Sequence, residues 1–191
     1  MLPEQLLSTV PIKGKYLSPD DIGTARVAYE LGGVALNDPS QGLRVQVWKL
    51  EAVGNRVLIS APNTVRKLLF SGTDITEVSL AFDQNMRPFV SFMDGVHAKI
   101  WWYDTLTATQ IFTELPSGSI TPKACLDDKR STQSASSDII VAYIRADKLY
   151  FRVQRDRFLV EYLLQSGLDA KLERIGMTDK NRVQFKLVPN V

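Results

Sequence analysis

Residues 79–84 read SLAFDQ, and the pattern of this stretch occurs four times along the chain. Each copy has an apolar residue, a small residue, a large apolar residue and then a polar residue. The four copies are Val34-Ala35-Leu36-Asn37, Leu80-Ala81-Phe82-Asp83, Ala124-Cys125-Leu126-Asp127 and Ile175-Gly176-Met177-Thr178. Their small residues stand at positions 35, 81, 125 and 176, so the steps between them are 46, 44 and 51 residues. Repetition at a period of roughly 20–50 residues predicts an architecture of repeated supersecondary units.

Segments typical of β-strands follow each copy. They are rich in β-branched and aromatic residues and are separated by turn residues. The segments are 43–50, 55–61 and 66–72, then 87–93, 98–104 and 109–115, then 138–144, 148–154 and 157–167, and finally 182–187. Gly72, Gly118 and Gly167 each follow a serine at the end of a unit, which predicts turns that need a positive φ.

The fourth copy is followed by one strand segment, RVQFKL at 182–187, and similar segments occur near the other end of the chain. GKYLS at 14–18 resembles a third strand, and RVAYELGG at 26–33 resembles a fourth. The sequence therefore predicts an all-β fold, a four-bladed β-propeller whose last blade is closed by N- and C-terminal strands. The single domain would cover residues 1–191, with blades at about 34–72, 79–118, 123–167 and 172–188 plus 12–33. The alternative is a β-sandwich.

The same propeller geometry explains the small residue in each copy. If each copy lies in the innermost strand of a blade, then Ala35, Ala81, Cys125 and Gly176 gather at the crowded axis. The large residues beside them then fill the space between blades.

Composition narrows the classes of function. The chain of 191 residues is 45% hydrophobic and 23% charged, with a formal net charge of +2, as in an ordinary globular protein. So small a charge excess argues against nucleic acid as a partner. No apolar run approaches the roughly 20 residues that span a bilayer, and no signal peptide is expected. With Cys125 as the only cysteine and His97 as the only histidine, we expect no internal disulfide, no metal and no cofactor.

The polar residue that ends each copy is a candidate for a polar ring at one mouth of the central channel. These residues are Asn37, Asp83, Asp127 and Thr178. Their oxygen atoms are suitable ligands for a hard cation. The alternative role is local, because Asp and Asn side chains commonly begin turns by hydrogen bonding to nearby backbone.

The third unit carries an insertion between its first and second strands. The step from Leu126 to Ile139 is 13 residues, whereas the equivalent steps in the other units are 6 or 7. Insertions on one face of a repeat architecture often mark the face used for contact. The candidate interaction loop comprises Asp128, Lys129, Arg130, Ser131, Thr132, Gln133 and Ser134. A tolerated surface loop is the equal alternative.

Catalytic motifs are absent from the sequence. His97 has no second histidine and no nucleophile elbow with which to build a triad, and no phosphate-binding glycine motif occurs. The run Trp101-Trp102-Tyr103 alternates between the two faces of a strand, and we interpret it as core between blades. The run at 152–157, RVQRDR, is interpreted as a solvated rim with Arg/Asp pairing or an interface edge. We therefore predict that the protein is not an enzyme.

Three longer stretches carry a resemblance to a known class. ALNDPSQGL, EVSLAFDQNMRPFVSF and DIIVAYIRADKLYFRVQRDRF resemble structural proteins of the tails of tailed-bacteriophage virions. The resemblance runs roughly from residue 28 to 187. It implies a protein assembled in the host cytoplasm and located in the virion, present in multiple copies, with other virion or tail proteins as its partners. The alternative is a lectin-like propeller that binds a host surface glycan.

Overall fold

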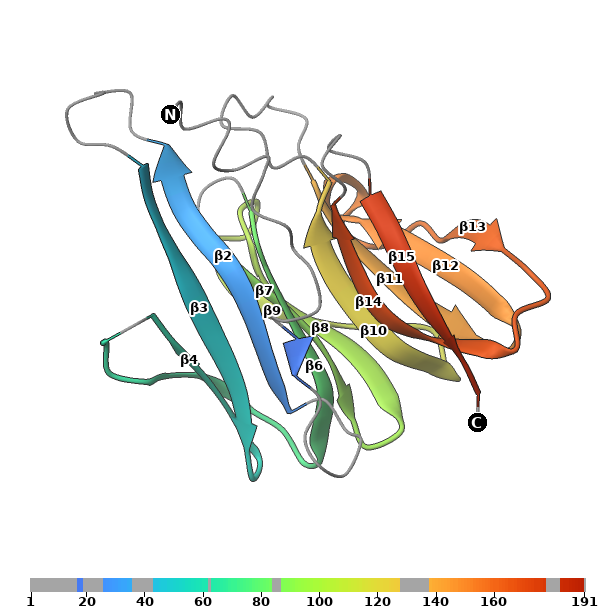
Figure 1. Ribbon diagram of the computed structural model, residues 1–191, viewed down its shortest axis with the longest axis horizontal. Coiled ribbons are helices and arrows are strands. Elements are labelled where there is room, and N and C mark those ends of the chain that lie inside the picture. The colour runs from blue at the N-terminus through green and yellow to red at the C-terminus, as the bar shows by residue number, and fades with distance from the viewer. Residues whose placement is uncertain are drawn as a thin grey trace.

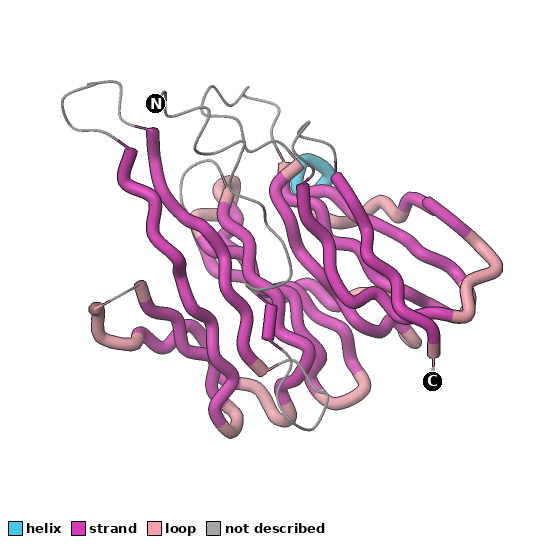
Figure 2. Tube along the Cα trace, in the orientation of Figure 1, coloured by secondary structure: helices cyan, strands magenta, loops and turns pink. Residues whose placement is uncertain are grey.

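The computed structural model describes residues 17–18, 26–35, 43–61, 63–83, 87–127, 138–177 and 183–190. Within these ranges the protein is all-β, and helix is confined to a 3₁₀ turn at Gln154–Asp156 (Figure 2). The strands form four antiparallel sheets that follow one another along the chain (Figure 1). Among the described residues no helix is long and apolar enough to cross a membrane.

Each sheet is a meander in which sequential strands are neighbours, and the first sheet has the order β1-β2-β3-β4-β5. Its strands are β1 (Leu17–Ser18), β2 (Val27–Ala35), β3 (Leu43–Val53), β4 (Arg56–Ser60) and β5 (Lys67–Ser71). The second sheet comprises β6 (Ile75–Phe82), β7 (Pro88–Asp94), β8 (His97–Asp104) and β9 (Thr109–Glu114).

The third sheet comprises β10 (Ser119–Leu126), β11 (Ile139–Arg145), β12 (Lys148–Val153) and β13 (Tyr162–Gln165). The fourth comprises β14 (Ala170–Met177) and β15 (Val183–Pro189). The predicted segments thus fall on observed strands. The exception is 157–167, of which only Tyr162–Gln165 is a strand.

The repeated pattern lies at the end of the first long strand of each sheet; in the first sheet this strand is β2, which follows the two-residue β1. Ala81, Cys125 and Gly176 are buried in β6, β10 and β14, and Ala35 is the last residue of β2. These first strands pack in chain order, β2 on β6, β6 on β10 and β10 on β14. Ala81, Cys125 and Gly176 therefore lie in strands that pack on those of neighbouring sheets, and their gathering at one axis stays a prediction.

Three hydrophobic clusters fill the spaces between consecutive sheets. The first cluster joins the first and second sheets and includes Leu50, Phe70, Phe92 and Trp101. The second joins the second and third sheets and includes Phe89, Ile100, Trp102, Val141 and Tyr143. The third joins the third and fourth sheets and includes Cys125, Ala142, Ile144, Leu172 and Ile175. Stability thus comes from sheet faces buried against neighbours on both sides.

The predicted closure of the ring is corrected by the pairing of β2. Segment 26–33 belongs to β2, which pairs with β3 along its whole length, from Val27↔Glu51 to Ala35↔Leu43. It therefore belongs to the first sheet, where it is the first long strand, and not to the last blade with 172–188. β1 pairs with β2 as well, through Leu17↔Ala28. The nine-residue strand continues through Gly32 and Gly33, which pair with Gln46 and Val45 of β3, and so reaches from Val27 into the repeat. The described residues form four antiparallel sheets, and among them neither a closed ring nor a two-sheet sandwich is observed.

The glycines at the ends of the units have two different roles. Gly118 and Gly167 have φ values of 79° and 73°, as predicted for their turns. Gly72 has no positive φ. A Cβ at Gly72 would lie 2.9 Å from Ile75 Cγ1 and 3.2 Å from Asp94 Oδ1, so this glycine permits close approach instead.

Candidate functional site

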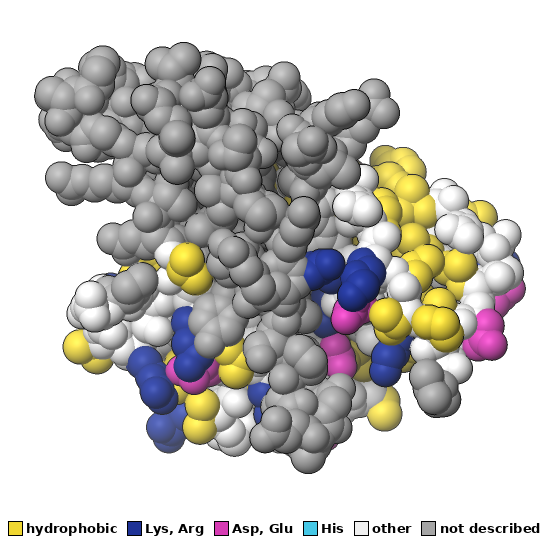
Figure 3. Space-filling view, in the orientation of Figure 1, with side chains coloured by type: hydrophobic (Ala, Val, Ile, Leu, Met, Phe, Trp, Pro, Cys, Tyr) yellow, Lys and Arg dark blue, Asp and Glu magenta, His cyan; other side chains and the backbone are white. Residues whose placement is uncertain are grey.

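The third sheet ends in an unusually apolar exposed segment. We call Leu159, Val160, Tyr162, Leu163 and Leu164 the apolar rim; between 41% and 73% of each residue is exposed. The first two residues precede β13 and the others lie in it. Figure 3 shows hydrophobic side chains gathered over this end of the molecule, where Figure 1 places β12, β13 and β15. Contiguous exposed apolar residues of this kind usually mark a contact surface.

Most of the rim lies in β13, an edge strand, where the backbone can pair with another chain. β13 is the outer strand of its sheet, pairs only with β12 and is exposed at all four residues. Edge strands are normally protected by charge, and the outer strands β5 and β9 begin with Lys67 and end with Glu114 respectively. β13 reads YLLQ and has no charged residue. It therefore combines free backbone groups with apolar side chains.

The loop before β13 is fixed by a buried aromatic ring. Arg157 and Phe158 have φ values of 57° and 61°, a conformation that costs energy for residues with a Cβ. Phe158 is fully buried, and its ring lies 6.0 Å from that of Phe89 and 5.3 Å from that of Trp102. Burial of this ring in the second cluster offsets the backbone strain and pins the loop against the second sheet.

An ion pair between the partly exposed Arg157 and the buried Asp104 adds a second anchor. Arg157 Nη2 donates to Asp104 Oδ2 at 2.5 Å, although the two residues are 53 positions apart. Asp104 is buried and also accepts hydrogen bonds from the backbone N–H of Leu106 and the hydroxyl of Thr107. Burial alone would raise its pKa, but the Thr107 and Leu106 hydrogen bonds and the Arg157 charge hold the pKa below its ordinary value. Asp104 is therefore an ionised anchor for the loop.

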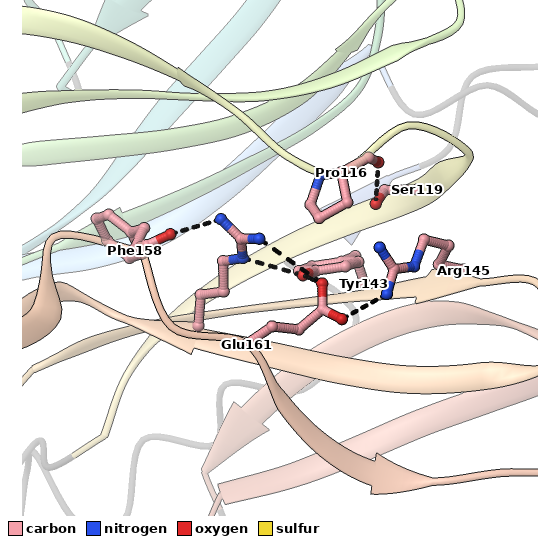
Figure 4. A network of polar contacts seen from close by, with 7 residues as sticks. Pro116, Ser119, Tyr143, Arg145, Phe158 and Glu161 are labelled. Carbon is pink, nitrogen blue, oxygen red and sulfur yellow. Dashed lines mark hydrogen bonds and ion pairs between the residues drawn. The ribbon is translucent and has the colours of Figure 1, made fainter.

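Glu161 organises a third anchor, drawn in Figure 4. Its carboxylate accepts from the hydroxyl of Tyr143 at 2.6 Å and from Arg145 Nη2 at 2.5 Å. Arg152 donates from Nε to the Tyr143 oxygen at 3.1 Å and from Nη1 to the carbonyl of Phe158 at 2.7 Å. Burial, followed by donation to Glu161, raises the pKa of Tyr143 far above its usual value, so the hydroxyl remains a donor.

These three anchors give the rim a rigid base. Phe158, Arg157 and Glu161 tie residues 157–161 to the second and third sheets, while the neighbouring apolar side chains point into solvent. A preorganised apolar surface loses little conformational entropy when it is covered. The arrangement is suited to binding another protein surface.

Two members of the predicted polar ring are described, and each accepts a hydrogen bond from the backbone of the residue that precedes the next strand of its sheet. Asp83 accepts from the backbone N–H of Arg87 at 2.8 Å, and Asp127 accepts from that of Asp138 at 2.8 Å. The donors are 4 and 11 positions further along the chain, so these contacts are not the bonds to nearby backbone of the local alternative, and the ring stays a prediction. Asn37 and Thr178 lie outside the described residues, as does the candidate interaction loop from Asp128 to Ser134. Within the described ranges, no group of three or more His, Cys, Asp or Glu residues is placed to hold a metal ion.

The aromatic run is core, as interpreted from the sequence. Trp101 and Trp102 are each 3% exposed, and Trp48 is half-buried against the first cluster. Trp101 and Trp102 therefore offer no open face on which a sugar ring could stack. His97 is exposed, and its Nδ1 lies 2.9 Å from Glu114 Oε1.

The run at 152–157 pairs with aspartates outside it. Arg155 Nε contacts Asp138 Oδ2 at 2.7 Å, and Arg157 contacts Asp104. Phe158, Glu161 and the rim were not predicted as a unit, because 157–167 has the pattern of one strand. The signal that distinguishes them is the charged Glu161 inside an otherwise apolar run, RFLVEYLL.

Comparisons with known proteins return little. No family model matches the chain, and no curated protein matches it. One solved structure that it resembles is titled "Luciferin-regenerating enzyme", with 12% identity and a TM-score of 0.38. The likeness covers 78% of this chain and 50% of the other, so the chain spans half the length of that protein.

The prediction that the protein is not an enzyme is corrected by this comparison, because the solved structure that it resembles is an enzyme by its title. At this identity and TM-score the likeness assigns no reaction to this chain.

Proposed function

We propose that this protein is a propeller-type structural module that assembles with other proteins of a tailed-phage virion through the apolar rim. The observation that carries the proposal is the rim itself, an uncharged edge strand with exposed apolar side chains on an anchored base. Surfaces of this kind are covered by partners in assembled particles. The resemblance of the strand segments to tail proteins supports the virion as the location.

The arrangement of the sheets supports the propeller part of the proposal. In each sheet the strand nearest the neighbouring sheets is the first long strand in the chain, and the later strands of the meander lie further out. Successive blades of a propeller have this order around their axis. The fourth sheet has two described strands, so closure of the ring requires strands beyond those in β14 and β15.

Mass spectrometry of purified virions tests the proposal. In phage carrying the double change Leu159→Ser and Leu163→Ser, we expect incorporation to fall at least tenfold, because the contact surface becomes polar. A matched control changes Val65 and Val96 to Ser; these residues are 85% and 80% exposed in turns of the first and second sheets. The control should be incorporated normally. Absence of the unmodified protein from purified virions, or equal incorporation of both variants, would contradict the proposal.

A further inference from the structure

We propose that the outer edge of β15 binds an extended β-strand supplied by another protein chain, which becomes the third strand of the fourth sheet. The inference deepens the proposed assembly function and rests on it, since it names the kind of segment that a partner contributes. It starts from the number of strands. The other sheets each contain at least four described strands, whereas the fourth contains only β14 and β15.

β15 is the second strand of its sheet and differs from the other second strands in its pairing. β7 pairs with β6 and β8, and β11 pairs with β10 and β12. β15 pairs with β14 from Val183 to Pro189 and has no second neighbour among the described residues. Among the described residues, seven residues of backbone therefore present an open edge, which is a template for a further strand.

β15 is less buried than β7 and β11, the second strands of the second and third sheets. The five central residues of β7 are all buried. Five of the seven residues of β11 are buried, and the other two are half-buried. β15 has no buried residue and alternates between half-buried and exposed positions from Val183 to Leu187. Phe185 and Leu187 pack against the third cluster but remain half-buried. A third strand would complete this cover and extend an interface that already exists between the third and fourth sheets.

The facing surface of the third sheet is also incompletely covered. Phe151 in β12 packs against the third cluster, and its register partner Tyr162 in β13 stacks on it with ring centroids 4.9 Å apart. By register, Ile100 in β8 occupies the position equivalent to Phe151. Ile100 is fully buried against the third sheet, whereas Phe151 is half-buried and Tyr162 is 41% exposed. An apolar strip thus lies where a third strand of the fourth sheet would lie.

The geometry specifies the occupant. Its backbone pairs with β15, and its inward side chains lie over Phe151 and Tyr162, so alternate residues must be apolar. Its other face lies beside Lys186, which is exposed and paired with Glu173, so the intervening residues must be polar. The occupant is therefore an extended segment with alternating apolar and polar side chains.

A second copy paired antiparallel through its own β15 does not fit. The two-fold axis that relates two antiparallel β15 strands is perpendicular to the sheet. The third sheets of both copies would therefore lie on the same side of the joined fourth sheets. The second copy's third sheet would then occupy the space of β12 and β13. A single extended segment of another protein avoids this clash.

A capped synthetic peptide, KLYFRVQ, is a suitable probe because residues 148–154 include the third strand of the third sheet. We expect saturable binding in fluorescence anisotropy, and slower amide exchange in Val183–Pro189 when the peptide is present. A scrambled peptide should bind at least tenfold more weakly.

Two substitutions on neighbouring residues of β13 sharpen the test. Tyr162→Asp places a charge under the inward side chains of the added strand and should weaken peptide binding at least tenfold. Leu163→Asp lies on the opposite face, paired with Tyr150, and should change binding less than twofold. Unchanged exchange in β15 at saturating peptide, or equal losses in both variants, would overturn the inference. A concentration-dependent dimer of the unmodified protein with a protected β15 would assign the edge to a second copy and would overturn it as well.

The two proposals fail in distinguishable ways. If the rim assembles the virion but β15 binds no strand, the Leu159/Leu163 variant loses incorporation while no peptide protects β15. If β15 binds the peptide but the protein is absent from virions, only the proposed function fails.

Discussion

At the scale of single residues, Asp94 shows how one carboxylate holds a sheet-to-sheet turn. Its Oδ1 accepts from the backbone N–H groups of Thr73 and Asp74, and its Oδ2 accepts from Lys99 Nζ at 2.8 Å. Burial alone would raise the pKa of Asp94, but the Lys99 hydrogen bond and the two backbone hydrogen bonds lower it to about 2.

Asp94 is therefore predicted to stabilise the fold above acid pH. Because the folded pKa lies below the ordinary value of 3.8, its contribution is full above pH 3.8 and is lost as the pH falls toward about 2. Asp94→Asn should lower the free energy of unfolding by about 2 kcal/mol at pH 7 and flatten the decline below pH 4. Urea denaturation at a series of pH values measures both effects.

Asp74→Asn is the matched control, since it removes the same charge from an exposed neighbour in the same turn. The control should change the free energy of unfolding by less than about 0.5 kcal/mol. Equal effects of the two substitutions, or an unchanged acid profile in Asp94→Asn, would contradict this role for the carboxylate.

At the scale of elements, the first strands are linked across sheets by side chains near their bulges. Register shifts occur in β6, β10 and β14 at corresponding places. Ser79 Oγ in β6 accepts from the backbone N–H of Ala124, and Thr121 Oγ1 in β10 accepts from that of Leu172. A bulge redirects side chains that would otherwise alternate, so a polar group can reach the backbone of the next sheet.

The ion pair between Glu77 and Lys123 also links β6 to β10. We predict that replacing Glu77 costs more free energy of unfolding than replacing Lys123. Lys123 Nζ donates to Glu77 Oε2 at 2.8 Å, and the side chains are 1% and 23% exposed respectively. Glu77→Gln leaves a buried ammonium without its counter-charge and should cost about 2–4 kcal/mol. Lys123→Met removes the buried charge, keeps the volume, and should cost less than about 1 kcal/mol.

Chemical denaturation of both variants measures this difference. A larger loss for Lys123→Met than for Glu77→Gln would show that the ion pair itself, rather than avoidance of an unpaired buried charge, stabilises the junction of β6 and β10. The double variant should resemble Lys123→Met.

The strands could be predicted from the sequence because their signals are local. A run such as DIIVAYI is apolar on both faces, and β11 is correspondingly buried on both. The segment 157–161 could not be predicted in this way, since Phe158 is fixed by rings of the second sheet and Arg157 by Asp104, contacts without a local signature. The partner of β2 was also unpredictable, because 26–33 matches a fourth strand as well as a first one.

At the scale of the whole molecule, the four sheets form a series in which each contacts its neighbours in the chain. The second and third sheets each have a cluster on both faces, whereas the fourth has the third cluster alone. The period of the repeats could predict this series, but no local pattern states whether its two ends meet. In such a series, stability is approximately a sum of nearest-neighbour interfaces.

This arrangement predicts that the fourth sheet unfolds separately from the rest. Leu172 in β14 is 1% exposed in the third cluster, and Leu172→Ala should remove about 2–5 kcal/mol from that interface alone. Amide exchange in β14 and β15 should accelerate, while exchange in β7 and β8 stays unchanged. Ile100→Ala, in the second cluster, should instead accelerate exchange in both sheets that it joins. Hydrogen-exchange mass spectrometry resolved by strand makes the comparison, and equal acceleration of β7 and β15 in Leu172→Ala would mean that all four sheets unfold as one cooperative unit.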